Sequence, residues 1–557
     1  MRGKSRATFK ASALALACAG LLSCETPSAK PAFVETAVSS PSLSVIVAVR
    51  RTSEDQYRQA IADVFGPEIK VNAKFEPEIR REGLLASGAE NGSISANGFE
   101  QYFAAARSIA TQAMDEKVRG RIVSCAPKDP KASDDACAQQ FISKVGRRLF
   151  RRALTDDEIA PRVLLAAKAS KDAGDLNAGL QAALVSLLTA PDFLFRIERA
   201  LPVNAPASSW TLDGYSRAAR ISYLIWDAPP DDELLTAAES GALTNRAGLE
   251  AQVQRLIASP RLEFGVRAFF ADLLQLDLFD TLSKDAAQYP KFSQAVASSA
   301  KEQTLKVVTD TLTTGKGDYR DIFTTRNTFI DRYLGAIYKV PFASDTDWTK
   351  YEFAKESGQS GVLTQVTFTA LFAHPGRSSP TKRGVALNDI FLCQTVPQPP
   401  ADVDLSALTN GATVGKTVRE RLQSHREQPL CAACHQLTDP MGLALEQFDG
   451  IGQKRLTENG APIDVSVDVM GKPISGASGL GEALRDDPRV PACLINRVYA
   501  YGVGRQLDSQ DRSAISESTK AFVGDGYNVV RAMARLAVSD TFFTTPAPAA
   551  RTNGDAQ

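Results

Sequence analysis

Hydrophobic residues along the chain recur mainly at the spacing of an α-helix. Between Tyr57 and Phe65 the apolar positions follow this period, Thr52 or Ser53 can cap the segment, and Gly66 can end it. The same period predicts further helices over 159–167, 179–197 with a break at Pro191, 212–226 and 249–274. Alternation typical of strands is confined to short pieces, at 44–49 and 463–469. The predicted fold class is therefore mainly α with few short strands.

The chain is too long for one hydrophobic core, and its breaks indicate several modules. It has 557 residues, and stretches rich in Pro, Gly and polar residues fall near 201–209, 340–360 and 398–413. A hydrophobic content of 44% and a charged content of 23% are typical of folded proteins. We therefore predict a multidomain helical assembly with modules over 46–120, 121–200, 208–340, 355–488 and 489–545, and a disordered tail over 546–557.

The balance of charge gives no general attraction for a polyanion. Lys plus Arg and Asp plus Glu are equal, at 64 each, so we predict no nucleic-acid partner. Beyond the N-terminus, no apolar stretch is long enough to span a bilayer.

The N-terminus has the pattern of an export signal. A basic start is followed by the apolar segment Ala11–Leu22, and Leu21-Leu22-Ser23-Cys24 resembles a bacterial lipobox. We therefore predict a lipoprotein signal peptide over 1–24, lipidation of Cys24, and a flexible tether over 25–45. The alternative is an ordinary secretory signal with an incidental cysteine. Glu25 favours the outer membrane, so the predicted location is the cell envelope, as an outer-membrane lipoprotein facing the periplasm or the cell surface.

The remaining cysteines suit an oxidising compartment. The chain has eight: Cys18, Cys24, Cys125, Cys137, Cys393, Cys431, Cys434 and Cys493. Cys125 and Cys137 enclose a polar loop that a disulfide would hold, and Cys393 and Cys493 flank the CxxC pair and could clamp that region. Sequence alone does not fix the pairing, and four free buried thiols are the alternative.

The strongest chemical motif is Cys431-Ala432-Ala433-Cys434-His435. Two thiols three residues apart on a helix can bond to the two vinyl groups of one haem, with the adjacent His as iron ligand. The alternatives are a redox-active CxxC pair, which would favour a βαβ setting, and half of a zinc site. We therefore predict one covalent haem c on Cys431 and Cys434, with His435 as the proximal ligand.

The residues leave the sixth iron ligand open. His425 lies six residues before Cys431, and Met470 lies beyond a turn-rich segment that could bring it back. Met441 is more simply a core residue, and His374 is a weaker candidate. An open sixth position would instead favour peroxide or oxygen chemistry.

Several motifs recur in the order of a known family. They are Gly146–Arg152, Thr189–Arg196, Arg220–Trp226, Ser379–Gly384, Cys431–His435, Asp439–Gly442 and Tyr499–Arg505. Taken together, they resemble the planctomycete-type cytochrome C multidomain proteins, built from consecutive domains of unknown function (the 1587, 1595, 1592, 1588 and 1585 series). The resemblance implies export, a cytochrome c-like CxxCH module and a redox role, without a substrate. A His recurrent in the family matches His425, which places it above Met470 as a ligand.

Two groups of charged residues invite a functional interpretation. Glu446 and Asp449 could form an acid–base pair, but capping or an ion pair to Lys454 or Arg455 is the favoured explanation. The arginine pairs within 147–152 indicate a solvated helix face or partners for buried acids, ahead of a contact with phosphate or a haem propionate.

Three functions remain possible. The first is electron transfer to or from an unidentified redox partner protein, by a c-type cytochrome lipoprotein anchored to the membrane. The second is a haem-dependent oxidase or peroxidase with an open sixth site and a small-molecule substrate. The third is a non-redox envelope scaffold whose CxxCH carries no haem. The sequence assigns no catalytic residue, so enzymatic activity stays open.

Overall fold

The computed structural model describes residues 44–127, 129–203, 209–314, 316–342, 347–397, 415–426 and 429–546. For residues 209, 424–426, 429 and 430 it describes the backbone alone. The predicted signal peptide with Cys24, nearly all of the predicted tether and the tail beyond Pro546 lie outside the described residues.

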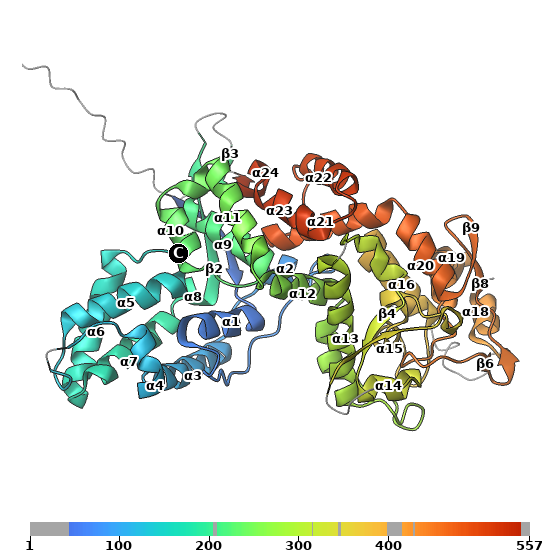
Figure 1. Ribbon diagram of the computed structural model, residues 1–557, viewed down its shortest axis with the longest axis horizontal. Coiled ribbons are helices and arrows are strands. Elements are labelled where there is room, and N and C mark those ends of the chain that lie inside the picture. The colour runs from blue at the N-terminus through green and yellow to red at the C-terminus, as the bar shows by residue number, and fades with distance from the viewer. Residues whose placement is uncertain are drawn as a thin grey trace, which may run out of the picture. The chain divides into compact units, whose positions relative to one another are not determined.

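The described chain is mainly helical, as the spacing of its apolar residues predicts (Figure 1). The first helix, α1 (Glu54–Phe65), begins after Ser53, whose side chain accepts a hydrogen bond from the Gln56 N–H, and Gly66 follows it. Further helices to residue 194 are α2 (Leu85–Gly88), α3 (Ala96–Ala113), α4 (Glu116–Ile122), α5 (Asp135–Phe150), α6 (Asp156–Ala173), α7 (Leu176–Leu188) and α8 (Pro191–Leu194).

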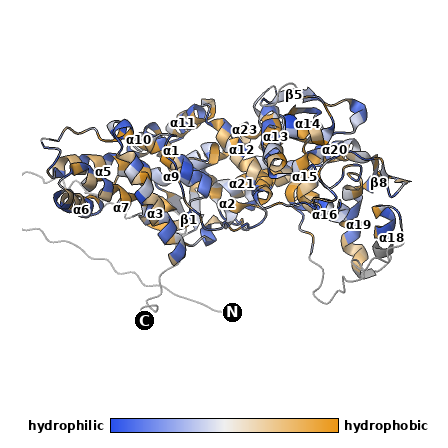
Figure 2. Cartoon of the chain, turned by 90° about the horizontal axis from the view of Figure 1, so that it is seen from below, coloured by the Kyte–Doolittle hydropathy of each residue, from blue (hydrophilic) through white to orange (hydrophobic). Residues whose placement is uncertain are grey.

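The helices beyond residue 212 combine apolar and polar residues. In Figure 2 both apolar and polar residues lie along the same helices, and α23 (Val529–Ala537) buries Val529, Ala532, Met533 and Leu536. The other helices are α9 (Gly214–Trp226), α10 (Asp232–Glu239), α11 (Arg246–Ala258), α12 (Leu262–Leu273), α13 (Gln294–Thr313), α14 (Arg332–Tyr338), α15 (Val366–Leu371), α16 (Pro380–Leu392), α18 (Val418–Arg426), α19 (Pro429–Leu443), α20 (Gly476–Asp486), α21 (Arg489–Val503), α22 (Arg512–Gly524) and α24 (Asp540–Phe543).

The strands of the described residues form one four-stranded antiparallel sheet and three two-stranded ones. The larger sheet has the order β1-β2-β3-β10, with β1 (Val45–Arg51), β2 (Phe195–Pro202), β3 (Ser209–Leu212) and β10 (Thr544–Pro546). The small sheets pair β4 (Asn327–Ile330) with β5 (Thr349–Glu352), β6 (Thr457–Glu458) with β7 (Ala461–Pro462), and β8 (Ser466–Val469) with β9 (Lys472–Ser475).

Two of the predicted helical segments differ in the structure. The segment over 179–197 breaks near Pro191 as expected, with α7 ending at Leu188 and α8 starting at Pro191, but from Phe195 the chain is strand β2 and not helix. The helix expected over 249–274 is two helices, because Pro260 lies between α11 and α12 and cannot donate a helical hydrogen bond. The predicted strand over 463–469 is shorter, since β8 begins at Ser466.

Three hydrophobic clusters form the interior of the described chain. One lies within residues 57–194, so α1 and α3–α8 share a core. A second, larger cluster joins α9–α12 to α16 and to the helices from α19 to α24, and a third surrounds α13–α15. The larger cluster includes residues of both α16 and α19, so the helix with the CxxCH motif is anchored in it.

Both expected disulfides are present. Cys125 pairs with Cys137 across the polar loop, and Cys393 pairs with Cys493, each with a Cα–Cα distance of 5.3 Å. The second bond ties the end of α16 to α21. No helix among the described residues has the length and apolar character needed to cross a bilayer.

Asp227 is a partly buried carboxyl group whose protonation should affect stability. Burial raises its pKa to about 7, and both Gln56 Nε2 and Tyr501 Oη donate to Asp227 Oδ1, at 2.7 and 3.2 Å. As pH rises from about 4, the unfolded chain releases this proton before the folded chain does, so stability falls until pH passes about 7. An Asp227→Asn variant keeps the accepting oxygen and should be more stable than wild type at pH 8, by up to ~4 kcal/mol.

Urea unfolding at pH 4 and pH 8 checks this expectation. The gain should almost vanish at pH 4, where the carboxyl is protonated in both states. Asp468→Asn, at an exposed position of β8, serves as the control and should change little at either pH. An equal effect of Asp227→Asn at both pH values would contradict the assignment.

Candidate functional site

The CxxCH motif lies on α19. Cys431 and Cys434 are three residues apart, so their side chains leave successive turns on one side of the helix, and His435 follows directly. All three side chains are partly exposed. The two disulfides use the other four cysteines of the described chain, so neither takes up a thiol of this motif.

His435 is held by a buried carboxylate one helical turn further on. His435 Nδ1 lies 2.9 Å from Asp439 Oδ2, and the Asp439 side chain is fully buried while that of His435 is 22% exposed. Thr381 Oγ1 donates to the other oxygen, Asp439 Oδ1, at 2.9 Å. Because an ionised carboxylate only accepts hydrogen bonds, this contact places the proton of the neutral imidazole on Nδ1. The lone pair is then on Nε2, which makes Nε2 the nitrogen suited to bind a metal.

Helix α16 supports α19 by direct contact between the two backbones. A Cβ atom at Gly384 would lie 1.9 Å from the Thr438 carbonyl oxygen, and one at Gly442 would lie 1.9 Å from the Pro380 carbonyl oxygen. Neither position has room for a side chain. Asn388 Nδ2 adds a bond to the Leu437 carbonyl at 3.3 Å. Contacts with α16 at Leu437, Thr438 and Gly442 therefore hold the helical turn that carries His435 and Asp439.

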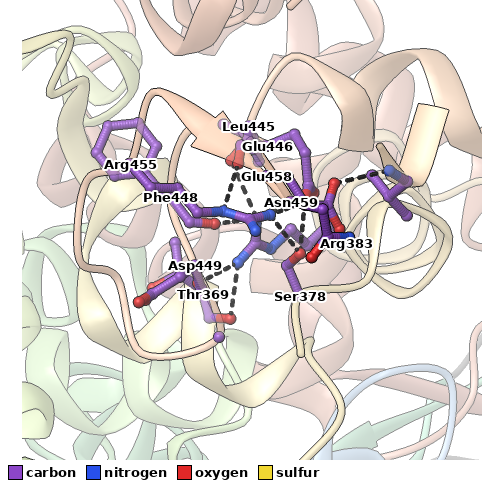
Figure 3. Close-up of polar contacts among 12 residues, drawn as sticks. Thr369, Ser378, Arg383, Leu445, Glu446, Phe448, Asp449, Arg455, Glu458 and Asn459 are labelled. Atoms are coloured by element: carbon purple, nitrogen blue, oxygen red, sulfur yellow. Dashed lines mark hydrogen bonds and ion pairs between the residues drawn. The ribbon is translucent and has the colours of Figure 1, made fainter. Parts of the chain in front are cut away.

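The turn that follows α19 is held by one buried arginine, Arg383 of α16 (Figure 3). The Arg383 side chain is 0% exposed. Its two terminal nitrogens donate to the carbonyl oxygens of Leu445, Phe448, Thr369 and Asp449, at 3.0, 2.8, 3.2 and 2.6 Å. One guanidinium thus joins the end of the CxxCH helix to α15 and α16.

The two carboxylates that suggested acid–base chemistry have structural partners instead. Glu446 is buried, contacts Arg455, accepts from Ser378 Oγ at 2.5 Å, and lies 4.0 Å from Arg383 (Figure 3). Asp449 accepts the backbone N–H groups of Ile451 and Gln453, both at 2.9 Å, which closes a loop. The ion pair of Glu446 to Arg455 is one of the explanations that the sequence favoured, whereas Asp449 binds the backbone of its own loop and caps no helix among the described residues.

Five family models match the chain in succession. Each describes a protein of unknown function: DUF1587 over residues 50–115, DUF1595 over 137–198, DUF1592 over 212–340, DUF1588 over 359–458 and DUF1585 over 470–542. These are the domains of the planctomycete-type cytochrome C multidomain series, in the order expected from the motifs. The chain belongs to this series. No curated protein and no solved structure matches it.

Within the series, one domain contains the whole arrangement around the motif. The DUF1588 match covers α16, α19, the Arg383 contacts and the His435–Asp439 pair. Met470 is the first residue of the DUF1585 match, whereas His425 lies inside the DUF1588 match. Of the two sixth-ligand candidates, only His425 therefore belongs to the same domain as the CxxCH motif.

Both candidate ligands lie on elements that contact α19. His425 is in α18, which packs against α19, although its side chain is outside the described atoms. Met470 lies at the turn between β8 and β9, is 37% exposed, and has a left-handed backbone with φ of 57°. Strand β8 also contacts α19. The choice between the two candidates stays a prediction.

The other two candidates have different surroundings. Met441 is 4% exposed and belongs to the large hydrophobic cluster, in agreement with a core role. His374 lies in a turn, where burial and then the nearby cations of Lys382 and Arg377 lower its pKa to about 4. Within the described residues, no group of three or more His, Cys, Asp or Glu side chains could hold a metal ion.

Three residues that shape the site have roles that were not predicted from the sequence. Asp439 follows His435 by one turn, a spacing that could have predicted their contact. Thr381 and Arg383 lie in the Ser379–Gly384 motif, but their contacts join residues 58 and 62 positions apart. Only the packing of α16 on α19 reveals what these two residues do.

Proposed function

We propose that this chain is an exported c-type cytochrome of the cell envelope, carrying one covalent haem and transferring electrons to or from a redox partner protein. Cys431 and Cys434 would hold the haem through thioether bonds, and His435 would bind its iron through Nε2. The observation that carries the proposal is the His435–Asp439 pair, because iron-binding and other metal-binding histidines commonly donate their second N–H to a carboxylate. When bound, the haem supplies one-electron redox chemistry.

The residues around His435 have defined tasks in this proposal. Asp439 fixes the tautomer and the orientation of the imidazole, and Thr381 fixes Asp439. The carboxylate also makes the imidazole a stronger electron donor, which favours the oxidised iron and lowers the reduction potential. The contact of α16 with α19 keeps this geometry rigid.

The two disulfides support export. Disulfides persist in oxidising compartments and are rare in the bacterial cytosol. Together with the lipobox-like segment at Cys24, they favour an outer-membrane lipoprotein that faces the periplasm or the cell surface. The lipid on Cys24 would be the membrane anchor.

A haem-dependent oxidase or peroxidase is the second candidate function. The Asp439 contact favours it as well, since a strongly donating proximal histidine helps to activate bound peroxide or oxygen. The two functions differ at the sixth ligand. Electron transfer needs a low-spin, six-coordinate iron with His425 or Met470 in place, whereas the enzyme needs an open position for a small-molecule substrate.

The test is haem attachment to the full chain, made with a cytochrome c maturation system. We expect one haem per chain in the pyridine haemochrome assay and a low-spin spectrum. Cys434→Ala should lose the second thioether bond and shift the α band, and a Cys431→Ala/Cys434→Ala double variant should retain no covalent haem. The matched control, Cys125→Ala/Cys137→Ala, should keep it. A wild-type protein without Soret and α bands would reject both redox functions and favour the scaffold.

The same preparation tests the role of Asp439. Asp439→Asn should keep the haem but raise the midpoint potential by ~60 mV or more, the equivalent of a tenfold change in the redox equilibrium. His425→Ala and Met470→Ala then identify the sixth ligand by a change of spin state. A high-spin wild-type spectrum, unchanged in both variants, would favour the enzyme.

A further inference from the structure

A small cavity lies where β1, β2, α9 and the end of α21 meet, within the four-stranded sheet region and apart from the CxxCH helix. Its lining is dominated by arginine side chains: Arg50, Arg151, Arg152, Arg196, Arg199 and Arg220. Glu198 and Asp213 are the only carboxylates among its described lining residues. The volume of the cavity is about 30 Å³.

Two of these arginines share one carboxylate. Arg50 Nη1 lies 2.8 Å from Glu198 Oε2, and Arg220 Nε lies 2.8 Å from Glu198 Oε1. All three side chains are buried. Burial alone would raise the pKa of Glu198, but Arg220 and Arg50 lower it to about 2, so this carboxylate is ionised. Burial, together with the like charges of Arg220 and Arg196, lowers the pKa of Arg50. One negative charge therefore faces two buried positive ones.

The other carboxylates in or beside the cavity already have ion-pair or hydrogen-bond partners. Arg152 pairs with Glu158 and Asp192, at 2.6 and 2.5 Å, and Arg199 shares Asp192 at 3.3 Å. The paired role of Arg152 is one that the sequence predicted. Asp213 caps α9 by accepting the Ser216 N–H at 2.8 Å. The six guanidinium groups thus have four carboxylates in or beside the cavity, and two of these, Asp213 and Glu158, also cap helices. Asp227 lies close enough to interact with Arg196 but does not line the cavity.

Three polar atoms of the lining residues have no hydrogen-bond partner among the described residues. They are Tyr223 Oη, Arg196 Nε and Arg152 Nε, and all three atoms are buried. Tyr223 as a whole is 4% exposed, and the Arg196 guanidinium lies over its ring, 4.8 Å from the centroid. Buried donors without acceptors are costly, so three around one cavity indicate that an acceptor belongs there.

We propose that this cavity binds a small oxyanion, with Arg196, Arg152 and Tyr223 as its donors. The excess of guanidinium groups favours an anion over neutral water, because charge-assisted bonds to oxyanions are stronger than neutral ones. The space corresponds to about two to three water molecules, which suits phosphate, sulfate or a carboxylate group and excludes a sugar or nucleotide.

The bound anion would stabilise the chain as a whole. The cavity is lined by residues from four of the five family matches, including Arg50, Arg196, Tyr223 and Gly504. A ligand that binds only the folded chain raises its unfolding temperature by mass action. This site is independent of the haem and of the proposed function.

The test is titration of the full chain with inorganic phosphate, sulfate and acetate, each compared with chloride at equal ionic strength. We expect saturable heat in calorimetry and a rise in melting temperature with at least one oxyanion. Acetate acting without the other two would identify a carboxylate ligand, and phosphate or sulfate acting more strongly would identify a tetrahedral one.

Two variants make the test specific. Tyr223→Phe removes only the hydroxyl, and Arg196→Gln removes one charge; each should weaken the affinity at least tenfold. The controls Tyr351→Phe and Arg531→Gln, outside the cavity lining, should bind as wild type does. The proposal is overturned if no oxyanion acts beyond chloride, or if the cavity variants bind with wild-type affinity.

Discussion

An Arg383→Leu variant is expected to lose ~3–5 kcal/mol of unfolding free energy, the range found when one partner of a buried ionic group is removed. The four carbonyl oxygens around Arg383 would lose their guanidinium donors, and leucine offers none. Glu446 would also lose one of its two supporting positive charges, the buried Arg383 at 4.0 Å, and keep only Arg455. Urea unfolding followed by circular dichroism measures the loss.

Two further variants distinguish the effect of the four hydrogen bonds of Arg383 from the effect of its charge. Arg383→Lys keeps the positive charge, but one ammonium cannot reach four carbonyls, so its stability should lie between wild type and Arg383→Leu. Arg531→Leu, at an exposed position, should stay within ~0.5 kcal/mol of wild type. An Arg383→Leu protein as stable as the Arg531→Leu control would show that the turn after α19 does not depend on this arginine.

A Gly442→Ala substitution should be nearly as damaging, although it adds a single methyl group. The new Cβ would meet the carbonyl oxygen, the carbonyl carbon and the Cα of Pro380 at 1.9, 2.4 and 2.6 Å. Because all three are backbone atoms, α16 and α19 must separate, and we expect a loss of ~3 kcal/mol or more. With haem bound, the same shift should move the midpoint potential, since His435 and Asp439 lie on the displaced helix.

The matched control is a Gly→Ala substitution that should raise the stability of the protein. Gly120 lies inside α4, and a Cβ there would meet nothing within 4 Å. Gly120→Ala should therefore stabilise the protein by up to ~1 kcal/mol, through helix propensity alone. Equal effects of the two alanines would mean that the close contact between α16 and α19 is absent in solution.

The parts of the fold that depend on local signals were predictable. Ser53 and Gly66 marked the ends of α1, and the apolar period gave the helical class. Strand β2 was not predictable, because Phe195 continues an apolar run that begins in α7. Its state is decided by pairing with β1, which is far away in sequence. No local pattern carries that information.

In the candidate site, too, the local motif was predictable and the contacts between distant segments were not. The CxxCH motif is local chemistry and is visible in five residues. The backbone contact of Gly384 with Thr438 depends on how two helices cross, and a glycine inside a helix has several possible reasons. The arginine cavity could not be predicted from the sequence either, because its residues come from distant segments that only the folded sheet brings together.

The order of strands in the large sheet has a consequence for how the protein is made. Strand β1 begins at Val45, yet the outer edge of β3 gains its partner only when Thr544–Pro546 has been synthesised. A chain that lacks these residues would fold with an open edge on β3, which can recruit another strand. A stop codon just before Thr544 would thus leave every helix through α24 encoded. The truncated protein would nevertheless expose the unpaired edge of β3, where it could bind a strand of another chain.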